Sequence, residues 1–336
     1  MFLDSIREDL GRRIIATGAA AWGYAPAEKV PQGVSDSYNA WLKAGFNAGM
    51  EYMERYMEVR DDPHLLLEGA QSVISIAYSY RQTEYKPALA AYAYGLDYHD
   101  VLRAKLREIA DFLAKDYGAQ SRICIDSAPI HERYWGVRCG LGSLCANGAL
   151  YVPGIGSDVF LAEIITTLPC EDTSAARINN IDSTPKRGNS IGKGSGGSDN
   201  SVSKPMCTDC GKCKSVCPGN AILCGGHIDA RKCVNYLTIE HRGEWNEEQK
   251  KVMEESGPTI MGCDRCLRVC PLNHGAAPTI LPEFRLRDNL RTITKADIAT
   301  MSQADFSRLF KGSPVKRAKL AGVRRNLGLC QEAKDT

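Results

Sequence analysis

Hydrophobic residues near the amino terminus recur at helical spacing, with charged residues between them. The hydrophobic positions are Leu3, Ile6, Leu10 and Ile14. A surface helix with one buried face explains this spacing. Residues 72–80 have the sequence SVISIAYSY, an apolar, β-branched run typical of a buried strand, and residues 101–113 return to helical periodicity. The pattern up to about residue 167 therefore predicts a domain of mixed α/β structure.

The composition changes over residues 172–204, where Ser, Gly, Asn and Lys replace apolar residues. Such a segment cannot bury enough surface to offset its conformational entropy, so it is expected to be a flexible polar insertion or linker. It separates a first domain over 1–171 from a cysteine-rich domain over 205–280. Residues 281–336 then form a basic helical segment. A chain of 336 residues is long enough for two domains.

The overall charge gives no sign of a polyanionic partner. Lysine and arginine total 42 and aspartate and glutamate total 40, which leaves a net charge of +2. Any nucleic-acid surface must therefore be local. Basic residues do gather near the carboxyl terminus, at Lys311, Lys316, Arg317, Lys319, Arg324 and Arg325. Either a polyanion-binding surface or a solvated helix face explains this segment.

The chain lacks any uncharged apolar run near the ~18 residues that a membrane-spanning helix requires. Arg12 and Arg13 precede a short apolar stretch and loosely imitate an export signal, but the amphipathic helix explains that segment better. The 14 cysteines crowd mostly into one segment at metal-ligand spacing, which argues against disulfides. These features predict a cytoplasmic protein with no membrane association.

The cysteine-rich segment contains the ligand run of bacterial ferredoxins, in which three thiolates hold one [4Fe–4S] cluster and the fourth reaches a second. The first run is Cys207-x2-Cys210-x2-Cys213-x3-Cys217-Pro218. The second run is Cys263-x2-Cys266-x3-Cys270-Pro271. This second run lacks its first cysteine, and Cys233 is the candidate that replaces it.

The crossed pattern of two-cluster ferredoxins predicts how these thiolates are shared. The predicted ligands of cluster one are Cys207, Cys210, Cys213 and Cys270, and those of cluster two are Cys217, Cys233, Cys263 and Cys266. Structural zinc is the alternative, but zinc sites do not call for a triple run that ends in Cys-Pro. The remaining cysteines have no mutual spacing and receive no role: Cys124, Cys139, Cys145, Cys170, Cys224 and Cys330.

Two clusters explain the delivery of single electrons but not what receives them. Elsewhere in the chain, six ordered motifs resemble those of the epoxyqueuosine reductase family, and together they cover nearly the whole sequence. They are WLKAGFNAGMEYM at 41–53, RDDP at 60–63, YGLDYH at 94–99, IDSAP at 125–129, RKCVNYLTIE at 231–240 and FKGSPVKR at 310–317.

The resemblance implies an α/β (α+β), nitroreductase-like domain that binds cobalamin, a bacterial ferredoxin-like domain with two [4Fe–4S] clusters, and a short helical carboxyl-terminal extension. It also implies a monomeric enzyme that reduces the epoxide of epoxyqueuosine, at the anticodon wobble position of tRNA, to queuosine. Electrons would come from an external flavodoxin- or ferredoxin-type donor. The common cobalamin signature Asp-x-His-x-x-Gly is absent after Asp97, but this family binds its cofactor without a histidine below the cobalt.

Carried over from the family, Asp126 matches the proton donor and a cobalamin contact, and Arg133 matches a contact to the tRNA substrate. The other cobalamin-contact positions are Arg60, Leu150, Leu161, Asn235 and Asp264. Expelling an epoxide oxygen is easier if it is protonated as it departs, which a carboxylic acid could do. Because an unperturbed aspartate has a pKa near ~3.9, we expect burial or the reduced cofactor to raise the pKa of Asp126. A turn aspartate is the alternative reading.

Two features depart from the family. Residues 140–147 (GLGSLCAN) lack the lysine usual in this stretch, and the polar insertion over 172–204 is atypical. Both are compatible with a relative that acts on another substrate, such as a reductive dehalogenase, which also pairs cobalamin with two clusters. Those proteins are usually longer and carry an export signal. A non-catalytic electron carrier is a further alternative, but it would have no use for Asp126.

Overall fold

A computed structural model describes residues 2–86, 88–170, 177–178 and 206–329. The predicted insertion over 172–204 lies outside the described residues, except for the short strand β7 (Arg177–Ile178). Among the described residues, no helix combines the length and the apolar content needed to cross a membrane.

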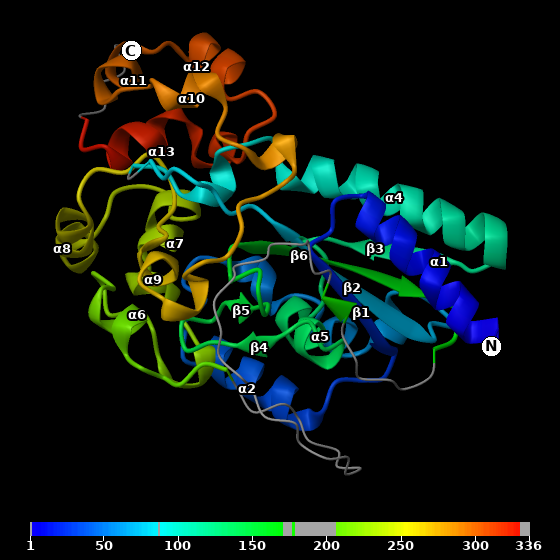
Figure 1. Cartoon of the computed structure of the whole chain (residues 1–336). Coiled ribbons are helices and arrows are strands. Elements are labelled where there is room, and N and C mark those ends of the chain that lie inside the picture. The colour runs from blue at the N-terminus through cyan, green and yellow to red at the C-terminus, as the bar shows by residue number, and fades with distance from the viewer. Residues whose placement is uncertain (1, 87, 171–176, 179–205, 330–336) are drawn as a thin grey trace, which may run out of the picture.

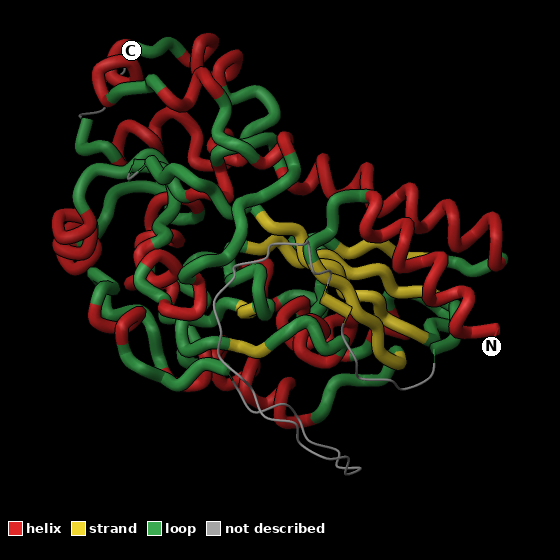
Figure 2. The backbone as a smooth tube through the Cα atoms, in the orientation of Figure 1, coloured by secondary structure: helices red, strands yellow, loops and turns green. Residues whose placement is uncertain are grey.

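A five-stranded antiparallel sheet forms the centre of the first half of the chain (Figure 2). Its strands, in spatial order, are β3 (Ser121–Cys124), β6 (Val159–Thr166), β2 (Ser72–Ser79), β1 (Ala21–Pro26) and β7. Every residue of β2 is buried, so the strand predicted over 72–80 is confirmed. Strand β3 lies at one edge of the sheet.

Helices cover both faces of this sheet (Figure 1). Helices α1 (Phe2–Ala16) and α4 (Tyr98–Tyr117) pack on one face, and α5 (Glu132–Arg138) packs on the other. Alternate residues of β2 point to opposite faces of the sheet. Ile74 belongs to the hydrophobic core under α1 and α4, whereas Val73 belongs to the core under α5. The predicted helices at 3–14 and 101–113 are therefore confirmed.

Short elements complete the first half of the chain and precede the cysteine runs. They are α2 (Gln32–Lys43), η1 (Glu51–Glu54), α3 (Met57–Asp61), η2 (Pro63–Leu65), η3 (Ala91–Ala93), β4 (Ser143–Leu144) and β5 (Leu150–Tyr151). The cysteine-rich segment contains α6 (Lys212–Ser215), η4 (Cys224–Gly226), η5 (Ala230–Lys232), α7 (Val234–Ile239), α8 (Glu247–Ser256), α9 (Arg265–Arg268) and η6 (Pro271–Asn273).

The cysteine-rich segment is hydrogen-bonded to the first half of the chain. The indole N–H of Trp41 donates to the carbonyl of Ile228 at 2.8 Å, and the backbone N–H of Ala230 donates to the carbonyl of Phe46 at 2.8 Å. A parallel bridge also joins Leu89 to Met261. The segment that follows α2 is thereby tied to the segment that carries Cys233.

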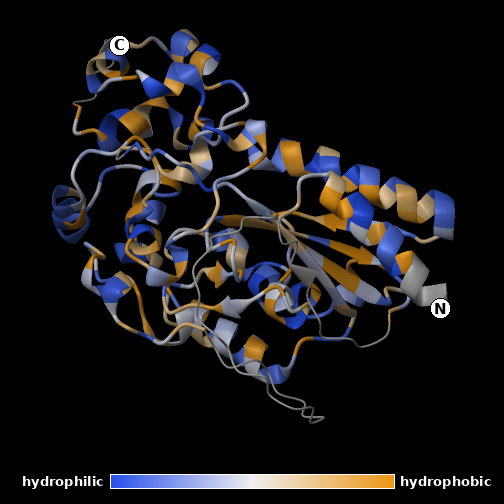
Figure 3. Cartoon of the chain, viewed as in Figure 1, coloured by the Kyte–Doolittle hydropathy of each residue, from blue (hydrophilic) through white to orange (hydrophobic). Residues whose placement is uncertain are grey.

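The carboxyl-terminal segment shares a core with the sheet. Its elements are η7 (Pro282–Phe284), α10 (Asp288–Arg291), α11 (Lys295–Thr300), α12 (Gln303–Leu309), η8 (Pro314–Ala318) and α13 (Lys319–Asn326). Phe284, Phe310 and Val315 belong to the same buried cluster as Leu102 of α4. Figure 3 shows hydrophobic and hydrophilic residues alternating along both α4 and these short helices.

Two of the carboxyl-terminal arginines act as structural donors. Arg324 donates to the carbonyl oxygens of Ala299 and Met301, each at 3.0 Å. Arg325 is 9% exposed and donates to the carbonyl of Leu237 in α7 at 2.9 Å. These guanidinium groups already bind backbone carbonyls, so both arginines support the fold, and their part in a polyanion-binding surface stays a prediction.

Gly23 of β1 gives a stability test of the sheet's packing against α5. A Cβ atom at Gly23 would overlap the backbone carbonyl of Cys139, which follows α5 and cannot move aside. We expect Gly23→Ala to lower the free energy of unfolding by about 3 kcal/mol or more. Gly33→Ala in α2 is the control, since nothing lies within 4 Å of its added Cβ, and it should leave stability equal or slightly higher. Equal urea-unfolding midpoints for the two variants would contradict this packing.

Candidate active site

Asp126 lies directly after edge strand β3 in a constrained loop. Its φ of 47° is in the left-handed region, which aspartate tolerates better than most residues. The backbone N–H of Asp126 donates to a carboxylate oxygen of Glu132 in α5 at 2.6 Å. Glu132 therefore holds the backbone of the loop from the α5 face of the sheet, whereas the Asp126 carboxylate faces Tyr98 and His99 at the start of α4.

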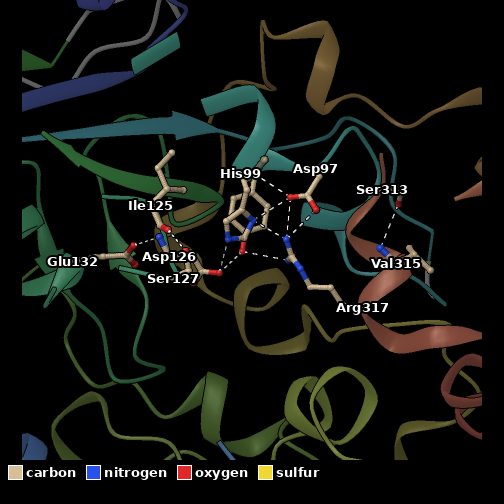
Figure 4. A network of polar contacts seen from close by, with 10 residues as sticks. Asp97, His99, Ile125, Asp126, Ser127, Glu132, Ser313, Val315 and Arg317 are labelled. Atoms are coloured by element: carbon tan, nitrogen blue, oxygen red, sulfur yellow. Dashed lines mark hydrogen bonds and ion pairs between the residues drawn. The ribbon is translucent and has the colours of Figure 1, made fainter. Parts of the chain in front are cut away.

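Three chain segments meet at the Asp126 carboxylate (Figure 4). The Tyr98 hydroxyl donates to Asp126 Oδ2 at 2.6 Å, and His99 Nε2 lies 3.2 Å from the same oxygen. His99 Nδ1 lies 3.0 Å from Asp97, the N-cap of α4. Arg317 of η8 donates to both Asp97 oxygens at 2.9 Å. The start of α4, the β3 loop and η8 thus form one polar network.

This network sets where the proton rests. Burial lowers the pKa of His99, but its bonds to Asp126 and Asp97 outweigh burial and raise that pKa to about 9. Burial raises the pKa of Asp126, but hydrogen bonds from His99 and Tyr98 hold it below its usual value. The expectation of a raised Asp126 pKa is therefore wrong for the protein alone. The Arg317 guanidinium, 2.6 Å from His99 Nδ1, lowers the histidine pKa, but the two carboxylates outweigh it and favour an imidazolium beside the Asp126 carboxylate.

Two further carboxyl groups lie behind the loop. Burial, together with the negative charge of Asp126, raises the pKa of Glu132 to about 7. Glu163 of β6 is fully buried and accepts a hydrogen bond from Ser75 at 3.0 Å, and burial raises its pKa well above the usual range. Glu163 is therefore protonated at neutral pH, and Glu132 changes charge near it.

Asp126 lies in a water-accessible recess. Its side chain is 56% exposed, although burial is the largest single influence on its pKa, so the carboxylate is partly enclosed but open to water. The space that this carboxylate faces is called the recess below. The hydroxyl of Tyr92 and the Nε of Arg60 are buried with no hydrogen-bond partner among the described residues. The charges of Asp264 and Asp126 both act on Tyr92, so its hydroxyl lies near this recess. These unpartnered polar groups suit a large cofactor rich in amide groups.

The cobalamin-contact positions carried over from the family fall into two places. Asp264 accepts from the backbone N–H of Ala91 at 2.7 Å, and burial raises its pKa to about 6. Asn235 faces the same stretch, because a Cβ on Gly262 would lie 3.3 Å from its side-chain oxygen and 3.2 Å from the Tyr92 ring. Arg60 reaches the far end of the Asp126 loop, at the carbonyl of Ile130, 3.5 Å away.

Leu150 and Leu161 lie instead beneath α5, where both would contact a Cβ added to Gly136. Leu150 belongs to the core on that face of the sheet, and Leu161 packs against it. Arg133 is exposed on α5, next to Glu132, whose pKa it lowers. Asn235 and Asp264 thus lie beside the stretch that carries Tyr92, Arg60 contacts the end of the Asp126 loop, and Arg133 is exposed on α5.

Seven of the eight predicted cluster ligands have electrostatic neighbours from their own predicted set. Burial raises the pKa of Cys266, and the negative charges of Cys263, Cys233 and Cys217 raise it further. Burial also raises the pKa of Cys213, and there the neighbouring thiols are Cys207 and Cys270. Cys210 is exposed. Thiols with raised pKa values become thiolates when a cation neutralises them, so these sets suit iron–sulfur clusters.

Within the described chain, no group of three or more His, Cys, Asp or Glu side chains is placed to hold a single metal ion. A cubane spaces its ligands more widely, because each thiolate binds a different iron.

Residues 140–147, the segment that differs from the family pattern, lie against the first cysteine run. The Ser143 hydroxyl accepts from the backbone N–H of Met206 at 3.3 Å, and Cys145 is buried beside Cys207. The stretch that lacks the family lysine therefore borders cluster one.

Comparison with known proteins identifies the family. Residues 60–127 match the family model for epoxyqueuosine reductase QueG, DUF1730, and residues 206–273 match a 4Fe-4S double cluster binding domain. An epoxyqueuosine reductase from Leadbetterella byssophila is 34% identical over 297 residues, covering 87% of this chain and 87% of that protein. One from Gloeobacter violaceus is 32% identical, covering 94% and 92%. This chain belongs to the epoxyqueuosine reductase family.

Solved structures of epoxyqueuosine reductases have the same fold. One, crystallised with an epoxyqueuosine-modified stem loop of a tyrosine tRNA, has a TM-score of 0.80 and 25% identity, covering 97% of this chain and 80% of that one. Another, from Bacillus subtilis with an aspartate-bearing catalytic loop swung out of the active site, has a TM-score of 0.79 over the same shares. The α/β architecture with a domain for two [4Fe–4S] clusters is confirmed.

Sequence reasoning assigned no role to Tyr98, His99 or Glu132. Tyr98 and His99 lie in the quoted motif at 94–99, so the motif itself was a usable signal. Their contact with Asp126 joins residues 27 or more positions apart, and no periodicity reveals such a contact. Arg317 was grouped with the basic tail, but it pairs with Asp97.

Cys233 offers a direct test of the ligand assignment. As the one predicted ligand outside both runs, its loss should remove cluster two, and Cys233→Ala should lower iron from about eight to about four atoms per chain. Cys224→Ala, at an exposed cysteine with no predicted role, should keep the full content. Iron and sulfide analysis after anaerobic reconstitution measures both. Full iron in the Cys233 variant would exclude it as a ligand.

His99 predicts a pH-dependent stability. Its pKa is raised from 6.5 to about 9, so its contribution is fully present below pH 6.5 and is lost as pH rises through 9. We expect the stability advantage of the wild type over His99→Gln to shrink across this window, by at most about 3 kcal/mol. Urea unfolding at pH 6 and pH 10, with exposed His274→Gln as control, measures it. A pH-independent difference would contradict the ion pair.

Proposed function

We propose that this protein is an epoxyqueuosine reductase, which removes the epoxide oxygen from epoxyqueuosine at the wobble position of a tRNA anticodon and leaves queuosine. The observation that carries the proposal is the Asp126–His99–Tyr98 network in a water-accessible recess of a chain from this family. The related structure crystallised with an epoxyqueuosine-modified stem loop supports the same substrate.

The proposed organisation follows the domain boundaries predicted from sequence. Residues 1–171 would form a nitroreductase-like domain that binds cobalamin and performs the reaction. Residues 205–280 would hold both clusters, and residues 281–336 would complete the recess through Arg317, which pairs with Asp97. A monomer with an external flavodoxin- or ferredoxin-type donor is sufficient for this scheme.

Cobalamin, when bound, would supply reducing chemistry at an epoxide carbon. Asp126, Arg60, Asn235 and Asp264 are the proposed contacts near the recess, with Leu150 and Leu161 as apolar contacts. The buried, unpartnered atoms of Arg60 and Tyr92 support a polar ligand there. The cluster thiolates would deliver electrons one at a time from the donor.

The protein's own residues would supply the proton. Removing the epoxide oxygen as water consumes two electrons and two protons. His99 holds a proton at neutral pH, since its pKa is about 9. That proton lies between His99 Nε2 and Asp126 Oδ2, which are 3.2 Å apart. We infer that the imidazolium of His99 passes its proton through the Asp126 carboxylate to the departing oxygen, and that water supplies the second proton.

The exposed position of Asp126 fits this role. A left-handed residue in a short loop can change conformation without disturbing β3, because the strand ends at Cys124. In the Bacillus subtilis relative an aspartate-bearing catalytic loop is swung out of the active site, which supports a movable Asp126 loop here. Arg133, exposed on the following helix, is proposed to contact the tRNA.

Asp126→Asn tests the function and the proton donor together. Asparagine also tolerates the left-handed conformation, so the loop should survive, while turnover should fall about 100-fold or more. The assay is anaerobic incubation of reconstituted protein, reductant and epoxyqueuosine-containing tRNA, followed by nucleoside mass spectrometry for the loss of one oxygen. Asp111→Asn, at an exposed position on α4, is the control and should turn over normally.

The outcomes separate the two claims. Near-normal turnover by Asp126→Asn would exclude the proton-donor role. Absence of conversion by wild-type protein, with cobalt and iron bound at full content, would instead exclude the proposed substrate.

A further inference from the structure

An open pocket of about 330 Å³ lies at the sheet edge, next to the Asp126 loop. Three arginines line it, Arg103 and Arg107 from α4 and Arg122 from β3. The rest of its wall consists of Ile123, Ile125, Ser127, Ala128 and Pro129. The wall residues therefore lie on both sides of Asp126 in the sequence.

The three arginines are available to a ligand. All three side chains are exposed, and none has an ion pair, hydrogen bond or ring contact among the described residues. Three guanidinium groups around one pocket repel one another unless an anion lies between them. Arginine donors also match the oxygens of a phosphate in pairs, which a lysine cannot do.

The pocket is aligned with the catalytic network. His99, Arg103 and Arg107 are spaced four residues apart on α4, so they form one row along a single face of the helix. Neighbouring members of such a row are about 5–6 Å apart. The helix face that places His99 against Asp126 therefore also carries two of the arginines that line the pocket.

The alternative basic surface contributes less than its sequence indicates. Arg317, Arg324 and Arg325 are bound to Asp97 or to backbone carbonyls, as described above. Within the part of the chain that the structure describes, the pocket arginines carry no such bonds. They are thus the free arginine cluster that shares a wall with the catalytic loop.

We propose that this pocket binds backbone phosphates of the RNA strand next to the modified nucleotide. This inference rests on the function proposed above, and it identifies residues that would bind the backbone of the RNA substrate. A base placed in the Asp126 recess must leave its stack, and the strand on either side must then pass over the loop that bounds the recess. Residues 127–129 of that loop form the pocket wall, so a flanking phosphate comes within reach of Arg103, Arg107 and Arg122.

The test is the salt dependence of RNA binding. The probe is an unmodified tRNA anticodon stem loop, and the method is fluorescence anisotropy with the cluster- and cobalamin-loaded protein at a series of salt concentrations. Each single-strand phosphate contact contributes about 0.7 to the slope of log K against log salt. The triple variant Arg103→Gln, Arg107→Gln, Arg122→Gln should bind more weakly, with a slope reduced in magnitude by about 2.

A second triple variant controls for net charge. Arg12→Gln, Lys115→Gln and Arg308→Gln remove the same charge from exposed positions outside the pocket. This variant should keep the wild-type slope. A reduced slope in the pocket variant alone supports the proposal, and equal slopes in both variants overturn it.

Further outcomes distinguish a failure of the proposed phosphate pocket from a failure of the proposed enzyme function. Binding of inorganic phosphate by the wild type, with an unchanged RNA slope in the pocket variant, would assign the pocket to a free anion and overturn the proposal. Because the probe carries no epoxide, the slope does not depend on turnover. Absence of epoxide reduction by wild-type protein would refute the proposed function, whereas an unchanged slope refutes only the pocket. Failure of the wild type to bind the stem loop would refute both.

Discussion

The geometry of the site depends on one stretch of backbone pairing, where residues 88–91 run beside residues 259–264. Ala90 donates to the carbonyl of Met261 at 2.9 Å, Thr259 donates through its hydroxyl to the carbonyl of Ala88 at 3.0 Å, and Asp264 accepts from Ala91 at 2.7 Å. Asp264 is flanked in sequence by two predicted cluster ligands, Cys263 and Cys266. A few residues after Ala91 the chain reaches the network around Asp126. This pairing therefore fixes the distance between the cluster cysteines and the recess.

The recess combines opposing electrostatic demands. Burial alone would keep Asp126 protonated and His99 neutral, yet their mutual contact reverses both tendencies, so that both are charged at rest. Arg317 secures the arrangement from behind by neutralising Asp97. The proton then lies on His99, whose Nε2 is 3.2 Å from the Asp126 carboxylate that would pass it to the substrate. The left-handed backbone of Asp126 lets the loop present this carboxylate to solvent while Glu132 holds its N–H.

Basic residues in this protein serve two different purposes. In α13, Arg325 and its neighbour Asn326 donate to carbonyls of α7 and of Ile260, and so join the cysteine-rich segment to the carboxyl-terminal helices. The arginines of the α4–β3 pocket have no such partners among residues 2–86, 88–170, 177–178 and 206–329, and they face solvent beside the Asp126 loop. The carboxyl-terminal basic residues are closer together in the sequence than the pocket arginines, so charge counts alone favour them as the polyanion-binding surface. Their hydrogen bonds show, however, that several of them already bind groups within the protein.

Local sequence patterns by themselves determined the cluster domain and the main elements of the sheet domain. The spacing of the cysteine runs determined the cluster domain, because thiolate geometry is read directly from short sequence intervals. The periodicity of β2, α1 and α4 determined the sheet and its covering helices, since each buries a face set by its own repeat. Only the tertiary structure decided which side chains meet at Asp126, that its pKa is lowered, and which arginines are free. Those properties arise from contacts between segments up to about two hundred residues apart, such as Arg317 with Asp97, and no local pattern encodes the distance between them.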